Sequence, residues 1–81
     1  MRWQHTIRSA SDYRHAPQRI RQAFDKQVRI LSKNLMHPSL RAKKFDERAG
    51  IWQARVNKDW RFYFTMEAGA CMIIRIIPHL K

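Results

Sequence analysis

Two alternating stretches between residues 50 and 66 predict a β-hairpin. Successive side chains of a strand point to opposite faces, so each stretch has one apolar and one polar face. The polar segment 57–59, Asn-Lys-Asp, suits the turn between them. The polar face would carry Arg55 and Arg61 on adjacent strands, where they could hold a phosphate. The apolar positions are Trp52, Ala54, Val56, Trp60, Phe62, Phe64 and Met66.

A second pattern predicts an amphipathic helix over the region that follows Pro17. Apolar residues recur there at three- and four-residue steps, which makes one apolar stripe. Proline suits the first turn of a helix. We expect the helix to end at residues 34–36, because His37 precedes Pro38 and a proline disfavours helix in the residue before it. The stripe consists of Ile20, Ala23, Phe24, Val28, Leu31 and Leu35.

The N-terminal segment predicts two short elements. Residues 3–7 alternate and favour a strand, with Ile7 on the same side as Trp3. Residues 9–12, Ser-Ala-Ser-Asp, supply N-cap side chains for a brief helix that continues to about His15.

The remaining segments are a connection and a strand. Residues 37–50 are expected to form a loop or irregular connection, with Leu40 and Phe45 anchored in the core. Residues 71–77 are almost continuously apolar, which is typical of a central strand covered on both faces, and Pro78 ends them.

The element order is strand, helix, helix, strand, strand, strand, and it predicts an α+β fold. Residues 1–81 would form one domain, a two-layer sandwich of two helices packed on a mainly antiparallel four-stranded sheet. The long helix would cover the sheet face that contains Phe62 and Phe64. Arg55, Arg61 and Tyr63 would then lie on the opposite face.

Charge narrows the range of partners. The chain has 17 Lys and Arg against 6 Asp and Glu, a net charge of +11, which favours a polyanionic partner such as nucleic acid, an anionic membrane surface or an acidic protein. The single Cys71 suits a reducing compartment. We find no apolar run of membrane-spanning length and no apolar signal core, so a cytoplasmic protein is expected.

Several kinds of chemistry lack support in the sequence, and no cofactor or metal is expected. There is no Gly-rich phosphate loop, zinc-ligand spacing or nucleophile elbow. RNA can be cleaved without metal, because its 2′-hydroxyl can attack the adjacent phosphate. Arg55 and Arg61 could stabilise the charge that develops, and His79 could transfer a proton. The alternative is that these are ordinary surface residues. Further point charges nearby are Lys43, Lys44 and Lys58.

Four short motifs, taken in order, resemble the RelE/ParE family of bacterial type II toxins. They are His-Pro-Ser-Leu-Arg-Ala-Lys-Lys at 37–44, Gly-Ile-Trp-Gln-Ala-Arg-Val at 50–56, Asp-Trp-Arg-Phe at 59–62 and Ile-Ile-Pro-His at 76–79. The resemblance implies a small cytoplasmic toxin neutralised by a cognate antitoxin, an acidic or DNA-binding small protein. Operator DNA would be bound only through the antitoxin. RelE-like members are ribosome-dependent mRNA endonucleases that need no metal, so ribosome and mRNA are the implied targets.

The resemblance also implies roles for individual residues. Arg61 stands where RelE-like members carry a catalytic arginine, His79 where some carry a histidine acid or base, and Arg55 at a basic position of the preceding strand. The basic residues expected to bind RNA are Arg41, Lys43, Lys44, Lys58 and Lys81.

One departure from the family pattern leaves alternatives open. Many active nucleases of the family carry a tyrosine after the position of His79, whereas this chain has Leu80 and Lys81 there. A gyrase poison of the ParE branch and a non-catalytic RNA- or ribosome-binding homologue are therefore the competing hypotheses.

Overall fold

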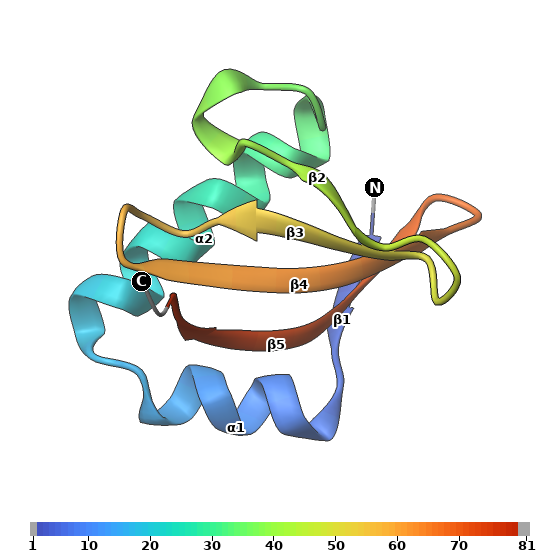
Figure 1. The fold of residues 1–81 in the computed structure, drawn as a ribbon. Coiled ribbons are helices and arrows are strands. Elements are labelled where there is room, and N and C mark those ends of the chain that lie inside the picture. Colours follow the sequence, from blue (N-terminus) through green and yellow to red (C-terminus); the bar gives the residue numbers. More distant parts are fainter. Residues whose placement is uncertain (1, 80–81) are drawn as a thin grey trace.

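The computed structural model describes residues 2–79, which form a five-stranded sheet with two α-helices (Figure 1). The strand order is β1-β5-β4-β3-β2, with β1 parallel to β5 and every other neighbouring pair antiparallel. The α+β class is confirmed, and the sheet has one more strand than predicted. The elements are β1 (Arg2–His5), α1 (Ile7–His15), α2 (Gln18–Lys33), the 3₁₀ turn η1 (Pro38–Leu40), β2 (Lys43–Asp46), β3 (Ile51–Arg55), β4 (Trp60–Glu67) and β5 (Ala70–Pro78).

The core lies between α2 and one face of the sheet. The predicted apolar stripe is confirmed, because Ile20, Phe24, Val28 and Leu31 are all buried. Phe24 of α2 meets Phe62 of β4 edge to face, with ring centroids 5.2 Å apart. The opposite face of the sheet is left uncovered by α2.

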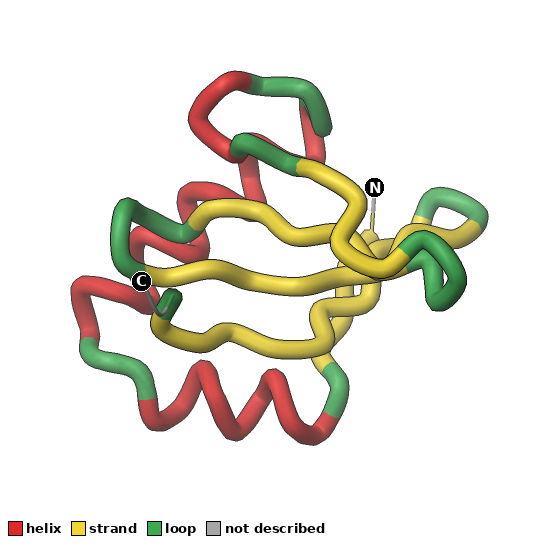
Figure 2. The backbone as a smooth tube through the Cα atoms, in the orientation of Figure 1, coloured by secondary structure: helices red, strands yellow, loops and turns green. Residues whose placement is uncertain are grey.

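Helix α1 lies at the edge of the sheet, alongside β5 (Figures 1 and 2). Strand β1 pairs only with the first half of β5, as far as Ile73. Beyond that point the Asp12 carboxylate accepts hydrogen bonds from the Ile76 backbone N–H (3.0 Å) and from Arg75 Nε (2.8 Å). An unpaired strand edge needs such partners, and α1 supplies one where β1 ends.

The hairpin prediction is confirmed. In the β3–β4 register Arg55 lies opposite Arg61, and Asn57 Oδ1 accepts the backbone N–H groups of Asp59 (2.8 Å) and Trp60 (2.9 Å) in the turn. The apolar run that follows is strand β5, which lies between β1 and β4 as predicted for a central strand.

Three local predictions are wrong. The first helix starts earlier than predicted: Thr6, and not one of residues 9–12, caps it by accepting the Ser9 N–H on its hydroxyl, so Ile7 opens α1 and does not lie in a strand. Ile7 is 93% exposed. Residues 43–46 are not irregular but form the edge strand β2, held by main-chain pairing with β3. Phe45 of this strand was expected in the core but is 60% exposed, whereas Leu40 is fully buried as expected.

No helix within residues 2–79 has the length and apolar character required to cross a membrane.

Candidate functional site

A basic hollow of about 340 Å³ opens on the sheet face that α2 leaves uncovered. Its lining comes from four strands or strand ends and from the segment after η1. We call it the basic hollow, and it is lined by Arg41, Lys43, Gln53, Arg55, Arg61 and His79. Five of these six residues were predicted from the sequence to contact RNA or to act on it.

The hairpin turn orients two of the arginines. Arg61 Nη1 donates to the backbone carbonyls of Asn57 (2.8 Å) and Trp60 (3.0 Å), and Arg55 Nε donates to the Asn57 carbonyl (3.2 Å). Both guanidinium groups are therefore fixed by neutral main-chain oxygens. Their positive charges remain available to a ligand.

The electrostatics of the basic hollow favour an anion. Burial and the nearby charges of Arg55 and Arg41 lower the pKa of Arg61 from its usual value, although Tyr63 and Asp59 act in the opposite direction. Among residues 2–79 the one ion pair is Asp12–Arg75, so no carboxylate forms an ion pair with a cation of the hollow. A bound phosphate would relieve this repulsion and accept several charged hydrogen bonds.

Arg41 enters the hollow from a left-handed backbone conformation, with φ of 46°. It follows η1, which His37 caps by accepting the Ser39 N–H on Nδ1 (3.1 Å). Such a conformation costs a non-glycine residue roughly 1–2 kcal/mol and is often found at functional sites.

A buried side chain of α2 connects the helix to this site. Gln27 is 6% exposed, and its Nε2 donates to the carbonyls of Ser39 (3.1 Å) and Arg55 (2.8 Å). It thereby fixes the turn that precedes Arg41 and the end of the strand that carries Arg55.

His79 reaches the hollow from the end of β5. Its backbone N–H donates to the Asp59 carbonyl (2.7 Å), which ties this chain segment to the hairpin turn, and its side chain is exposed. The imidazole therefore lies where it can meet both solvent and a ligand of the arginines.

Sequence reasoning missed Gln53 as a member of this site. Its Nε2 donates to the Tyr63 hydroxyl (2.8 Å), and it shares a strand face with Arg55. That shared face was the signal that could have identified it.

Two of the predicted RNA-binding lysines, Lys44 and Lys58, do not line the basic hollow. Lys44 lies over the Trp52 ring, 5.1 Å from its centroid, because its neighbour Lys43 takes the face that bears the hollow. Lys58 is exposed in the hairpin turn. Lys81 lies outside the described residues. Within residues 2–79 we find no cluster of three or more His, Cys, Asp or Glu able to hold a metal ion.

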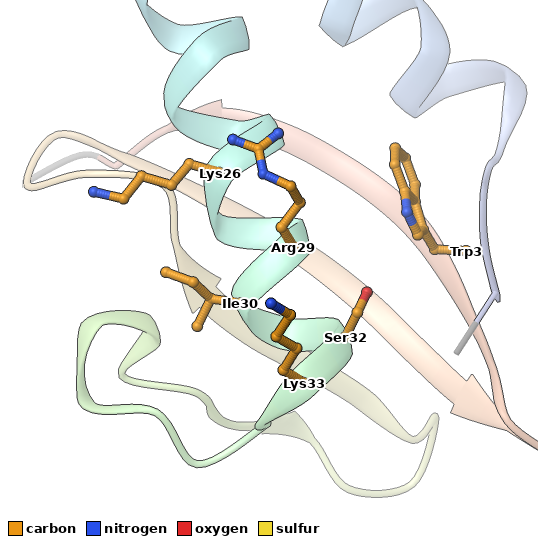
Figure 3. Close-up of a pocket in the computed structure, with 6 residues that line it drawn as sticks. All are labelled: Trp3, Lys26, Arg29, Ile30, Ser32 and Lys33. Carbon is orange, nitrogen blue, oxygen red and sulfur yellow. The ribbon is translucent and has the colours of Figure 1, made fainter.

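A second hollow, which we call the helix groove, runs between α2 and Trp3 of β1 (Figure 3). It has a volume of about 410 Å³. Trp3 and Ile30 give it apolar surface, and three cations surround them. Its lining residues are Trp3, Lys26, Arg29, Ile30, Ser32 and Lys33.

Comparisons with known proteins place the fold. No protein-family model matches the sequence, and no curated protein matches it either. Among solved structures, a YoeB/ParE toxin from Agrobacterium tumefaciens superposes with a TM-score of 0.80 at 19% identity, covering 99% of this chain and 100% of that one. A YoeB dimer from Staphylococcus aureus gives a TM-score of 0.83 at 13% identity, covering 99% of this chain and 98% of that one. An archaeal RelE–RelB complex from Pyrococcus horikoshii OT3 gives 0.78 at 15% identity, covering 95% and 92%. Over nearly its whole length the chain therefore has the fold of the RelE/ParE toxins.

Proposed function

We propose that this chain is the cytoplasmic, single-domain toxin of a type II toxin–antitoxin system, and that it cleaves mRNA on the ribosome without a metal. The observation that carries this proposal is the basic hollow, which collects Arg41, Arg55 and Arg61 around one exposed imidazole, that of His79. The likeness of the fold to YoeB and RelE toxins supports it.

The arrangement suits cleavage by internal attack. A phosphate held by Arg55 and Arg61 is attacked by the neighbouring 2′-oxygen, which loses its proton as the new P–O bond forms. The bond to the 5′-oxygen breaks, and that oxygen takes up a proton. The guanidinium groups stabilise the extra charge on the phosphorane, and His79 supplies one of the two proton transfers.

The arginines and His79 should each make a large contribution to the cleavage rate. Removing one preorganised donor to a developing oxyanion lowers kcat roughly 100- to 1,000-fold. Losing a general acid or base lowers the rate roughly 100- to 10,000-fold. We therefore expect Arg61→Ala and His79→Gln each to reduce cleavage by at least about 100-fold.

Controlled expression in bacteria tests the proposal. Growth and the positions of mRNA 5′ ends are measured after induction of the wild type, Arg61→Ala and His79→Gln. Arg19→Ala serves as the matched control, because it removes an exposed positive charge of α2 outside the hollow. The mechanism fails if both site variants still arrest growth and cleave mRNA like the wild type.

The competing functions give different results in the same cells. A gyrase poison would induce the DNA-damage response and leave mRNA intact. A non-catalytic module would bind RNA with a steep dependence on salt but would produce no new mRNA ends.

A cognate antitoxin is the proposed protein partner. The similar archaeal structure is a RelE–RelB complex, and the helix groove of this chain combines apolar surface with three cations, which suits an acidic segment. An adjacent reading frame for a small acidic protein, whose co-expression restores growth, would support this assignment. Operator DNA would be bound only through that antitoxin.

A further inference from the structure

We propose that an apolar hollow beside the basic hollow receives a nucleobase of the same RNA strand. This inference rests on the proposed function, since it assigns a second part of the RNA to the same sheet face. The apolar hollow has a volume of about 240 Å³. It is lined by Phe45, Ile51, Tyr63, Ile74, Arg75 and Ile77.

Two regular strands, β3 and β4, contribute to both hollows at a fixed spacing. Residues two apart on a strand share a face and are separated by about 6.6 Å, at 3.3 Å per residue. Strands β3 and β4 each place one residue in the basic hollow and another, two positions away, in the apolar hollow. Two further pairs have the same sequence separation, although Phe45 lies at a bulge of β2 and His79 lies just beyond the end of β5. A single nucleotide spans such a distance between its phosphate and its base. The pairs are Lys43 and Phe45, Gln53 and Ile51, Arg61 and Tyr63, and His79 and Ile77.

A bulge in β5 completes the wall of the apolar hollow. Tyr63 pairs with Arg75 while Phe64 pairs with Ile73, so Ile74 is an extra residue in the ladder. Neighbouring residues of a regular strand would point to opposite faces, but the bulge allows Ile74 and Arg75 to line the same hollow.

Tyr63 forms the boundary between the two hollows. Its hydroxyl accepts a hydrogen bond from Gln53 in the basic hollow (2.8 Å), and its ring meets Phe45 edge to face with centroids 4.9 Å apart. The two rings therefore have a defined mutual orientation before any ligand arrives.

The chemistry of the surroundings favours a base over an apolar protein segment. Phe45 is 60% exposed, an aromatic ring left out of the core on an edge strand. A partner that fills this hollow must also meet the uncompensated positive charge next to it. Single-stranded RNA offers flat bases and phosphates together, and exposed aromatic rings beside cations are its usual binding surface.

Binding of two uncleavable RNA strands tests this inference apart from catalysis. Both are fluorescent 2′-O-methyl hexamers of one backbone, one carrying bases and the other abasic at its central positions. Affinity is measured by anisotropy at low salt for the wild type, Phe45→Ala, Arg61→Ala and Ile7→Ala. Ile7→Ala is the matched control, because it removes an exposed apolar side chain on α1. Thermal melting verifies that each variant is folded.

We expect the wild type to prefer the strand with bases. Phe45→Ala should weaken that binding roughly 5- to 150-fold, the usual effect of losing one stacking contact, and change abasic binding less than about twofold. Arg61→Ala should weaken both, and Ile7→Ala neither.

Three results would overturn the inference. They are equal wild-type affinity for the two strands, an equal loss on both strands in Phe45→Ala, and unchanged affinity for both strands in Phe45→Ala. If growth arrest were lost in Phe45→Ala while its RNA affinity stayed unchanged, the apolar hollow would be assigned to a protein ligand instead. Because neither strand can be cleaved, base-dependent binding that requires Phe45 supports the inference even if the cleavage assay fails.

Discussion

Replacing Gln27 with methionine should weaken both the fold and the site, because this one amide joins helix α2 to the turn that precedes Arg41 and to the end of the strand that carries Arg55. Methionine has a similar shape but no donor. The carbonyls of Ser39 and Arg55 would lose hydrogen bonds of 3.1 and 2.8 Å. A neutral hydrogen bond contributes about 0.5–1.5 kcal/mol, so the expected loss for two is about 2 kcal/mol. In a domain of this size that loss lowers Tm by roughly 8–16 °C.

Urea unfolding with linear extrapolation measures the effect, and α2 offers a matched control. Gln22 belongs to the same helix but is exposed, so Gln22→Met should change the free energy of unfolding by less than about 0.5 kcal/mol. RNA affinity measured well below the melting temperature should also fall in Gln27→Met, because the turn before Arg41 and the end of β3 are no longer held together.

Two outcomes would contradict this reasoning. If Gln27→Met and Gln22→Met unfold at the same urea concentration, the two hydrogen bonds carry no net stability. If Gln27→Met is destabilised but binds RNA like the wild type while folded, the amide supports the fold without positioning the site.

Three further predictions concern single residues. Burial alone would raise the pKa of Asp12, but hydrogen bonds from Arg75 and from the Ile76 N–H, with the charges of Arg75 and Arg8, hold it below its ordinary value. Asp12→Asn should therefore lose about 1 kcal/mol at pH 7, discounted for partial exposure. When urea unfolding is measured at a series of pH values, the stability difference between the wild type and Asp12→Asn should persist above about pH 4. It should vanish as the pH falls through the lowered pKa that Asp12 has in the folded state. Arg41→Gly removes a side chain from a left-handed backbone position, so the free energy of unfolding should stay unchanged or rise by up to about 1 kcal/mol. Its RNA affinity should fall, and the slope of log affinity against log salt concentration should become less steep by about 1, because one phosphate contact is lost. Burial raises the pKa of Cys71 to about 11, so a thiol reagent at pH 8 should label it only after urea is added; labelling of the folded protein would contradict its burial.

The elements predicted correctly are those in which the spacing of apolar side chains shows which face is buried. The period of α2 places Phe24 in the core, and the alternation of β3 and β4 places Arg55 and Arg61 together on the other face. A short turn fixes the register of such a hairpin, so the pairing of the two arginines follows from the local sequence alone.

Strand β2 could not be predicted in this way. Its four residues are all exposed, so they show no apolar period, and the strand exists because its main chain pairs with β3. Ile7 was misplaced for a similar reason. The choice between Thr6 and Ser9 as helix cap depends on the Thr6 N–H bonding to the Ile73 carbonyl (3.0 Å), a contact 67 residues away in the chain.

The site was only partly accessible from sequence, since two of its supports come from tertiary structure. Arg41 adopts its left-handed conformation as the C-cap of η1, directly after the buried Leu40. In the sequence Gln27 is one more polar residue of an amphipathic helix. Its role is visible only in the folded structure, where η1 and β3 bring the carbonyls of Ser39 and Arg55 within hydrogen-bonding distance of its amide.

The groups that hold the arginines explain how the site remains charged. A carboxylate placed beside Arg55 or Arg61 would orient them well, but it would also neutralise them and compete with phosphate for the same forked donors. The structure uses the carbonyl oxygens of Asn57 and Trp60 instead, and it supports the surrounding main chain with the neutral amide of Gln27. Neutral partners fix direction without cancelling charge. The positive charges therefore repel one another in the free protein, and a bound phosphate relieves that repulsion. The same repulsion lowers the stability of the free protein and strengthens the binding of phosphate.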